Sequence, residues 1–543
     1  MSSSAVFTGD GSLLLRCAQA WLAAGHRIER IATRSDPVLR WARENGVSVV
    51  NADADAPLAL AGTAFDYLFS VSNLQVLRPD LIARARVMAI NFHDGPLPRY
   101  AGLHVTSWAL MAREYTHGIT WHEMTARVHA GRIVRQVTFD IAVNETALGL
   151  MTRCHEAGLA AFEDMAQDIA RGPLALAAQS NERRYFSRDL RPGALGTLDW
   201  HQAATELAAL VRGLDYGHCP NPLALPKVWT GTGIVLIRTA SPLLRPSYAE
   251  PGTVLRVDGD TLHVATALGD LSLGGCTDAD GNAGVRGIAA GQVLPTLPPA
   301  VRQRFADRIT SIARGEIRWR RAWSELAPVE LPYPRELPCE VQAAPSELRA
   351  ALGTAPEASV TAAAFMAWLA ELTGQPRVSL AYSDAELVAQ AGGLESWLSV
   401  MVPLSADIAR GASQAALVNA VSSEIAACRV AGPCPRDLRL RLGERQVPPL
   451  RIGLALAPVD DASGFDLLLA CDANGQLEVR SNDSVFSAET LNALASHLAL
   501  WLGAFDAGDR MAVSLNGADL RYAGLSAYRA GANSPDALWT RPT

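Results

Sequence analysis

The stretch Ile90–Leu103 reads INFHDGPLPRYAGL and directly follows the apolar residues VMA. It presents an amide, Asn91, and an imidazole, His93, at the point where an apolar run of strand type ends. Two prolines, Pro96 and Pro98, then fix the backbone φ angle and lower the conformational entropy of the loop. This pattern predicts a strand whose end carries two polar side chains on a stiff loop.

The residues before this stretch alternate short apolar runs with helical patterns. The runs of strand type are SAVFTG, RIERIAT, VSVV, DYLFSV and VMAINF, and the helical patterns are SLLLRCAQAWLAAGH and PVLRWARENG. Such alternation predicts an α/β fold with a parallel sheet and helices on both faces. Ligands of these sheets bind beyond the carboxyl ends of the strands, where we expect Asn91 and His93. A further helix is predicted over 147–172, capped by Asn144 or Thr146.

Length and composition narrow the function classes. The chain has 543 residues, of which 49% are apolar and 19% charged, with a formal net charge of -7. Single cores stop growing at about 250–300 residues, so two to four domains are expected. The mild acidity argues against a dedicated nucleic-acid binder, and no apolar run is long enough to predict a membrane span. The eight scattered cysteines suggest reduced thiols in the cytoplasm and no zinc site.

Asn91 and His93 suggest a specific chemistry. A side-chain amide can donate a hydrogen bond to a carbonyl oxygen that gains negative charge. A nearby imidazole can take up or deliver a proton near neutral pH. These are two of the parts needed to move an acyl group between nitrogens. A polar turn that merely ends a strand remains open as the alternative.

Further motifs follow in order: HGITWHEMT and then HAGRIVRQ. Together with the opening stretch they resemble the folate-dependent formyltransferase family, which includes methionyl-tRNA formyltransferases, sugar-amine formyltransferases and formylating domains of peptide synthetases. The family pattern is Asn-x-His, Leu-Pro-x-Tyr-x-Gly, Gly-(Val/Ile)-Thr-x-His and Asp-x-Gly-x-(Ile/Leu). Its positions fall here on Asn91, His93, Leu97, Pro98, Tyr100, Gly102, Gly118, Ile119, Thr120, His122, Gly131 and Ile133, with Gln136 behind them.

The resemblance covers about residues 1–300. It implies a Rossmann-like formyltransferase domain over 1–185 and a small OB-like β-barrel domain over 186–300. It also implies that 10-formyltetrahydrofolate is the donor substrate and that an amine is the acceptor, with no metal. Asn91 would then hold the formyl oxygen, and His93 would assist proton transfer. The backbone of FSVSNLQVL would help to form the pterin pocket, with candidate binding residues Phe69, Val71, Ser72, Leu74, Leu97 and Gly131.

Two positions depart from the family pattern. His129 stands where the family has its catalytic Asp, and Gly95, preceded by Asp94, stands where Ser is common. A carboxylate can orient an imidazole and balance its charge, whereas a protonated His129 would repel a protonated His93. Losing such a carboxylate can lower a rate by several orders of magnitude. Three interpretations stay open: Asp94 or another carboxylate supplies the charge, His129 is itself the base, or the domain is kept for binding or architecture.

The other histidines of this region, His104, His117 and His122, are expected to be structural or loop residues.

The second half of the chain has a different character. A linker is predicted over 301–339, with a charged helix, AVRQRFADRITSIARGE, and then the proline-rich APVELPYPRELP. Two segments follow, SVTAAAFMAWLAELTGQPRVSLAYSDAE and FDLLLACDANGQLEVRSNDSVFSAETLNALASHLALWLGAF. Through them, residues 340–515 resemble the second half of a condensation domain of peptide synthetases, which is chloramphenicol acetyltransferase-like. No His-His pair occurs, so this half-domain would lack chemistry of its own; an unrelated α/β module is the alternative. Residues 516–543 are a tail.

The resemblances together suggest an N-formyltransferase that acts in nonribosomal peptide biosynthesis, a form of secondary metabolism. The acceptor would be an amino acid on a peptidyl carrier protein that comes from elsewhere, because no Gly-Gly-x-Ser carrier segment is present. The hypothesis from another class is a catalytically degenerate scaffold that docks carrier proteins. Transfer of another small acyl unit is the third possibility.

Overall fold

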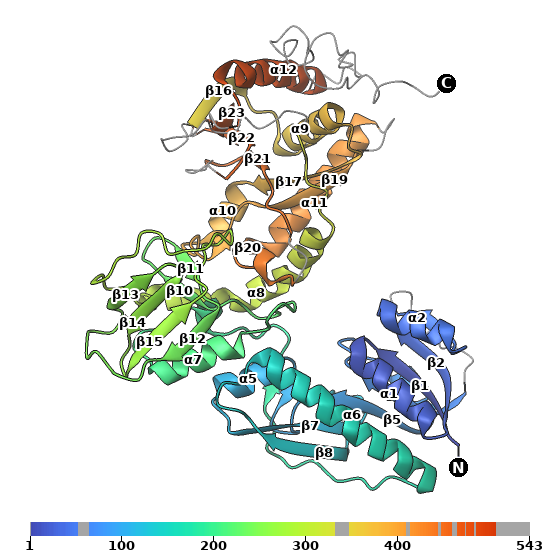
Figure 1. The fold of residues 1–543 in the computed structure, drawn as a ribbon. Helices are drawn as coiled ribbons and strands as arrows, with labels where there is room; N and C mark the ends of the chain where they lie inside the picture. Colours follow the sequence, from blue (N-terminus) through green and yellow to red (C-terminus); the bar gives the residue numbers. More distant parts are fainter. Residues whose placement is uncertain are drawn as a thin grey trace, which may run out of the picture. The chain divides into compact units, whose positions relative to one another are not determined.

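A computed structural model of the chain describes residues 2–52, 64–331, 347–408, 413–443, 447–458, 464–472, 474–482 and 485–506. They form two compact units (Figure 1). The first ends at Leu297, and the second begins at Pro298 and also includes the short pieces 232–234 and 279–281. Within these ranges, no helix has both the length and the apolar character needed to span a bilayer.

The first unit is built on a seven-stranded sheet with the order β3-β2-β1-β4-β5-β7-β8. Its strands are β1 (Ser4–Gly9), β2 (Arg27–Thr33), β3 (Val49–Asn51), β4 (Phe65–Val71), β5 (Ala85–His93), β7 (Thr116–Glu123) and β8 (Ile133–Asp140). The first five strands in this order are parallel. β7 and β8 continue the sheet as an antiparallel edge. The predicted α/β fold with a mostly parallel sheet is therefore confirmed, whereas the antiparallel edge was not predicted.

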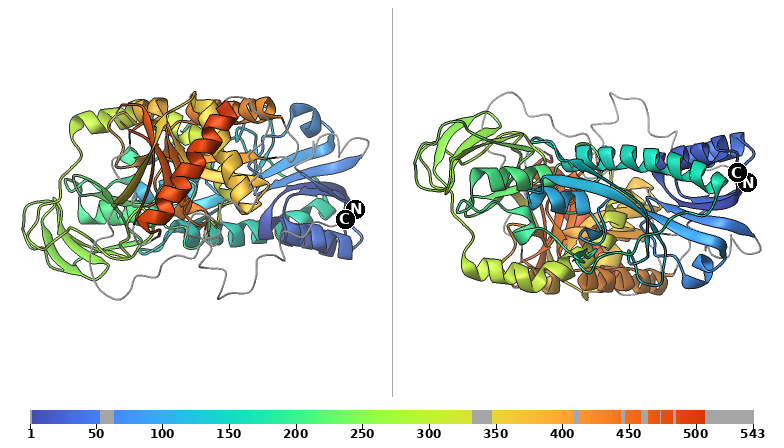
Figure 2. Two further views of the ribbon diagram at one scale, coloured as in Figure 1. Left: turned by 90° about the horizontal axis from the view of Figure 1, so that it is seen from above. Right: turned by 90° about the horizontal axis from the view of Figure 1, so that it is seen from below.

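Helices cover the sheet unequally. They are α1 (Gly11–Ala23), α2 (Asp36–Glu44), α4 (Pro79–Ile82), α5 (Val105–Met111) and α6 (Ala147–Arg171). α1 and α6 pack on one face, where α6 runs alongside the strands (Figures 1 and 2). Between these helices and the sheet lies an aromatic core that includes Phe7, Trp21, Phe69 and Phe162. Thr146 begins α6, because its hydroxyl accepts the Gly149 N–H at 3.1 Å, so the second of the two predicted caps is the right one.

Residues after α6 form the smaller part of the first unit. The elements there are β9 (Tyr185–Phe186), which pairs with β6 (Ala101–Gly102), α7 (Ala204–Gly213), β10 (Lys227–Trp229), β11 (Ile234–Leu236), β12 (Thr239–Pro242), β13 (Val254–Asp258), β14 (Thr261–Ala265) and β15 (Asp270–Gly274). β12 to β15 form an antiparallel sheet in the order β12-β15-β14-β13, and β10 pairs with β11. The sequence Asp258-Gly259-Asp260 is typical of a hairpin turn, and a hairpin is present there between β13 and β14, with Gly259 at a φ of +61°. A closed OB-like barrel stays a prediction.

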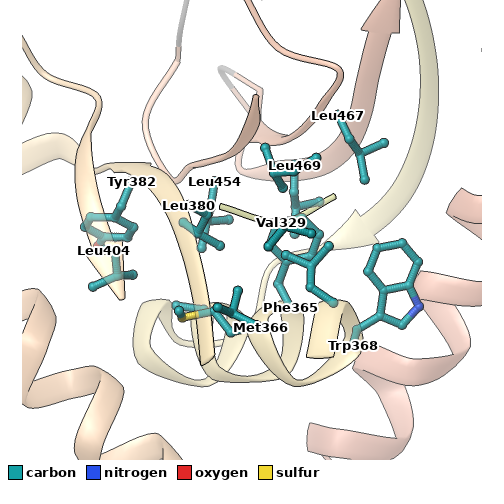
Figure 3. Packing of buried hydrophobic residues seen from close by; sticks show 14 of the residues in the cluster. Val329, Phe365, Met366, Trp368, Leu380, Tyr382, Leu404, Leu454, Leu467 and Leu469 are labelled. Atoms are coloured by element: carbon teal, nitrogen blue, oxygen red, sulfur yellow. The ribbon is translucent and has the colours of Figure 1, made fainter. Parts of the chain in front are cut away.

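The second unit contains a six-stranded mixed sheet with the order β16-β23-β22-β21-β17-β19. Its strands are β16 (Glu347–Thr354), β17 (Arg377–Ser383), β19 (Val402–Asp407), β21 (Ile452–Ala455), β22 (Leu467–Cys471) and β23 (Gln476–Asn482), with the short pair β18 (Leu398–Ser399) and β20 (Cys434–Pro435). Its helices are α8 (Pro299–Ser324), α9 (Ala358–Thr373), α10 (Ala385–Ala391), α11 (Gln414–Ala431) and α12 (Ala488–Asp506). Phe365, Met366 and Trp368 of α9 pack against the buried leucines of the sheet (Figure 3).

α8 lies within the region predicted as a linker, and its environment differs from that of a linker. Its Trp319 is fully buried in the core of the second unit, and Glu316 is 1% exposed. Val329, just beyond the helix, belongs to the same core. The physical reason is that the helix carries an apolar stripe beneath its charged face, and this stripe packs on α11 and β19. The rest of the predicted linker (332–339) and the predicted tail (516–543) lie outside the described residues, and the condensation-like half-domain stays a prediction.

Candidate active site

β5 lies between β4 and β7 in the sheet, and its carboxyl end carries Asn91 and His93. Asn91 pairs with Ser70 of β4 on one side and with His122 of β7 on the other. His93 lies opposite Thr120 of β7. The register of these three strands therefore brings together Asn91 and His122, which are 31 residues apart, at the strand end where Asn91 and His93 were expected.

The loop that follows β5 is fixed by hydrogen bonds to the antiparallel edge. The Leu97 N–H donates to the Thr120 hydroxyl at 3.1 Å, and that hydroxyl donates to the Gly95 carbonyl at 2.8 Å. The Gln136 side-chain amide donates to the Leu97 carbonyl at 2.8 Å. These contacts satisfy the buried backbone groups of the loop, so the loop holds a single position beside His93.

His93 is 3% exposed, and one of its ring nitrogens is committed to the backbone. Its Nε2 lies 2.5 Å from the Tyr100 carbonyl oxygen, which can only accept, so Nε2 carries a proton and donates. Nδ1 of the neutral ring is then an acceptor, and Oδ1 of Asp94 lies 3.6 Å from it. Burial lowers the pKa of His93, while the Asp94 carboxylate and the Tyr100 carbonyl oppose that effect.

Asn91 is held by a second histidine. Its Nδ2 donates to the Phe92 carbonyl at 2.7 Å and to Nε2 of His122 at 3.2 Å. The other ring nitrogen of His122 donates to the Glu123 carbonyl at 2.9 Å, which fixes the tautomer. Burial lowers the pKa of His122 to about 4, so the ring is neutral at pH 7 and can accept from the amide. His122 is thus a residue of the site that the sequence interpretation treated as structural.

His129 joins the same cluster from the loop between β7 and β8. Its backbone is left-handed, with a φ of 54°, and its Nδ1 accepts the Gly102 N–H at 3.0 Å. The ring centroid lies 4.1 Å from that of His93 and 5.4 Å from that of His122. Burial lowers the pKa of His129 strongly, and the two neighbouring imidazoles and Arg183 lower it further. Three neutral imidazoles and one amide therefore meet at the end of β5.

Comparison with known proteins gives family matches for two regions of the first unit. Residues 24–165 match the family model described as Formyl transferase, and residues 194–283 match the model described as Formyl transferase, C-terminal domain. The chain therefore carries formyltransferase-type domain matches over these two regions and is a transferase.

Solved structures similar to the formyltransferase half come from several proteins. The sugar 3N-formyl transferase WlaRD, in the presence of dTDP and 5-N-formyl-THF, is 17% identical over 50% of this chain and 98% of its own, with a TM-score of 0.40. The N-formyltransferase from Helicobacter canadensis, in complex with folinic acid and dTDP-3-aminofucose, is 15% identical over 51% of this chain and 100% of its own, with a TM-score of 0.41. HypX from Aquifex aeolicus, in complex with tetrahydrofolic acid, is 19% identical over 50% of this chain and 44% of its own, with a TM-score of 0.38.

The departure at Gly95 has a steric reason within this formyltransferase domain. A Cβ on Gly95 would lie 2.8 Å from the Tyr100 carbonyl oxygen and 3.0 Å from Nε2 of His93. These are the two atoms of the hydrogen bond that fixes the His93 ring. A serine at this position would therefore disturb that bond. Gly131 is similarly restricted, because its Cβ would lie 1.9 Å from the Glu123 carbonyl oxygen.

The predicted folate-binding residues of the formyltransferase domain separate into three groups. Phe69, Val71 and Leu97 are buried, and Phe69 packs at 5.0 Å from both the Phe7 and the Phe162 ring centroids, so its side chain serves the core. Leu74, in contrast, is 68% exposed.

Ser72, the remaining predicted residue on this strand, has a left-handed φ of 49° just after β4. Among the described residues, its hydroxyl is buried without a hydrogen-bond partner, and so is Nδ2 of the next residue, Asn73. Two unpartnered polar groups thus lie at the end of β4, the strand that pairs with Asn91. A buried polar group without a partner is destabilising, so this position favours a polar ligand.

No metal centre accompanies these groups in the part of the chain that the structure describes: no cluster of three or more His, Cys, Asp or Glu side chains there could hold an ion. Each of the three imidazoles has one ring nitrogen bonded to a backbone group, and Nε2 of His122 also accepts from Asn91. Hydrogen bonding and proton transfer are the chemistry that this arrangement can carry out.

Proposed function

We propose that the chain transfers a formyl group from 10-formyltetrahydrofolate to an amine. The observation that carries the proposal is the convergence of Asn91, His93 and His129 at the carboxyl end of β5, inside a formyltransferase domain. An amide donor and a buried imidazole are two of the groups that acyl transfer between nitrogens needs.

The end of β4 fits the pterin part of such a donor. A pterin presents a row of amide and amino groups along one edge, and the unpartnered Ser72 hydroxyl and Asn73 amide can pair with it. Backbone groups of residues 69–77 would complete the contact, because this segment leaves the sheet beside Asn91. The folate would supply an activated formyl group and would take a proton on the nitrogen that the formyl group leaves.

Asn91 and His93 would divide the remaining work. Asn91 would donate to the formyl oxygen in exchange for its bond to His122, which at 3.2 Å is the longer of its two. His93 would take the proton of the attacking amine at Nδ1, because Nε2 already carries one. His93 is buried and Asn91 is partly buried, which limits the access of water that would otherwise compete with the amine for the formyl group.

The acceptor that we propose is the amino group of an amino acid on a peptidyl carrier protein, in the cytoplasm and in nonribosomal peptide biosynthesis. Support for this comes from the resemblance of residues 340–515 to half of a condensation domain. The formyltransferase matches alone favour an amine as the acceptor, and they do not indicate which molecule bears that amine. A different small acyl donor and a non-catalytic scaffold are the outcomes that a direct test separates from this proposal.

The test is incubation with 10-formyltetrahydrofolate labelled with ¹³C in the formyl group and a panel of aminoacyl carrier proteins and amino-sugar nucleotides. The proposal predicts that an aminoacyl carrier gains one labelled formyl group by mass spectrometry, and that His93→Gln loses this activity while His201→Gln, at an exposed position, retains it. Gain on an amino sugar only would contradict the carrier. Folate binding without transfer to any acceptor would favour the scaffold, and no folate binding would contradict the proposed site.

A further inference from the structure

The protonation states of His93 are restricted by its neighbours. Nε2 donates to the Tyr100 carbonyl, so a second proton can be added only at Nδ1. The ring is buried to 3% exposure, and a cation there needs a counter-charge because water cannot solvate it. The question is which group supplies that charge, since the family's carboxylate is replaced by His129.

The groups around His93 include one candidate for this counter-charge. Among the described residues, the titratable or charged groups that face it are Asp94 on its own loop, His117 and His122 of β7, His129 of the following loop, and Arg183 before β9. Only Asp94 can be an anion. Its Oδ1 lies 3.6 Å from Nδ1, which is closer than the distance of about 4–6 Å within which an opposite charge favours ionisation.

Asp94 is held in this position from two sides. Its carbonyl accepts from Nε2 of His117 at 2.8 Å and from the Cys154 thiol of α6 at 3.7 Å. Its side chain is 31% exposed, so the carboxylate keeps contact with water while it faces the buried ring. The backbone of Asp94 is therefore fixed, and its carboxylate is placed to interact with the His93 ring.

His129 is unsuited both to balance the charge of His93 and to act as the base itself. Its Nδ1 accepts the Gly102 N–H, so protonation there would break that bond and leave a buried donor unpaired. A positive charge on His129 would also lie beside the His93 ring, at a centroid distance of 4.1 Å. The ring therefore stays neutral throughout the transfer.

We propose that Asp94 is the positioning residue of the site: it balances the charge of His93 when Nδ1 takes the proton, in place of the carboxylate that His129 replaces. The inference rests on the proposed function. The proton leaves the amine nitrogen as that nitrogen bonds to the formyl carbon, resides on Nδ1, and then passes to the folate nitrogen whose bond to the formyl carbon breaks. No other reactant is needed.

The first measurement is an NMR titration of the ¹⁵N-labelled histidine rings, with His93 assigned from His93→Gln. It needs neither folate nor acceptor, so it remains informative if the proposed function fails. Asp94→Asn should lower the pKa of His93 relative to the unmodified chain, and adding His129→Asp to Asp94→Asn should raise it again. Asp164→Asn, at an exposed carboxylate on α6, is the matched control and should leave it unchanged.

The second measurement is the pH dependence of formyl transfer. Asp94→Asn should lower kcat about tenfold or more and move the acid limb toward lower pH, and Asp94→Glu should recover part of the rate. Asp94→Ser provides the same comparison if Asp94→Asn does not fold. A His93 titration that is the same with and without the Asp94 carboxylate would overturn the proposal. A pH–rate profile that is unchanged in Asp94→Asn would also overturn it.

Discussion

The two units bury polar side chains in opposite ways. In the second unit Glu316, Asp437 and Arg441 are each 1% exposed and are charged, with Arg441 2.7 Å from Glu316 and 3.4 Å from Asp437. Arg320, 3.7 Å from Glu316, supplies a second cation. In the first unit His93 and His122 are almost as deeply buried and His129 is partly buried, but each ring is neutral and bonded to the backbone. One cluster neutralises its charges internally, and the other avoids charge.

This difference distinguishes a charged cluster that stabilises the fold from a neutral cluster that can take part in a reaction. Charges that are fully paired inside a protein cannot change their state without a large loss of stability. A neutral imidazole with a partly exposed carboxylate beside it can gain a proton and lose it again at modest free energy. The site around His93 has this second property, which is what proton transfer during formyl transfer requires.

The largest effect that the comparison predicts is on activity. His93→Gln removes the proton acceptor and should lower kcat for formyl transfer by roughly 10²–10⁴-fold. Steady-state kinetics with the labelled folate measures it, and circular dichroism checks that the domain still folds. A loss of activity no larger than that of His201→Gln would mean that the neutral imidazole cluster does not take part in formyl transfer.

The second prediction concerns the charged cluster. Arg441→Met removes the guanidinium that pairs with the buried Glu316 and Asp437 and leaves Glu316 only Arg320, at 3.7 Å, which should destabilise the second unit by about 3–5 kcal/mol. Hydrogen exchange of peptides from α8 measures this. The control is Arg321→Met on the exposed face of α8, where the ion pair with Glu325 should contribute less than about 1 kcal/mol. Equal protection in the two variants would contradict the structural role of the cluster.

The third prediction is the pH dependence of stability in the first unit. The folded pKa of His122 is about 4, below the ordinary value of about 6.5, so the unfolded chain binds the proton more tightly. Stability from this residue is therefore complete above about pH 6.5 and should fall by roughly 3 kcal/mol as the pH drops toward 4. Denaturant unfolding at several pH values measures it, and His122→Gln should flatten the dependence relative to His201→Gln. Parallel curves for the two variants would refute the assignment.

The smallest effect tests the packing around the neutral cluster. Gly95→Ala places a Cβ against the Tyr100 carbonyl and the His93 ring, and should destabilise the first unit by about 1–3 kcal/mol. Gly172→Ala is the matched control, because a Cβ there meets nothing within 4 Å and its φ of 164° is extended backbone. The melting temperatures of the two variants should differ. If they coincide, the close packing does not constrain His93.

Much of the fold could be predicted because local patterns determine it. The apolar runs that end at Val71 and at His93 have the composition of buried strands, and both strands are present as β4 and β5. The helical pattern TLDWHQAATELAALVRGL favours a helix that opens at Asp199, whereas α7 begins at Ala204. The preceding residues pair with β10, through the bond from the Leu198 N–H to the Lys227 carbonyl, and no local pattern shows a contact over that sequence distance.

The site was predictable only in part for a related reason. Asn91 and His93 are two residues apart in the sequence, so the motif identified them together. The contact between Asn91 and His122 depends on the antiparallel register of β5 and β7, which the sequence pattern does not specify. The fixed orientation of Nε2 in His93 likewise depends on a carbonyl seven residues away, at Tyr100.

The most direct test of the central claim is an NMR titration of the ¹⁵N-labelled histidine rings with 5-formyltetrahydrofolate, a stable relative of the donor. We expect saturable shifts of His93, His122 and His129 and unchanged signals for the exposed His201. Saturable binding that leaves those three rings unchanged would contradict the claim that the end of β5 is the formyl-transfer site.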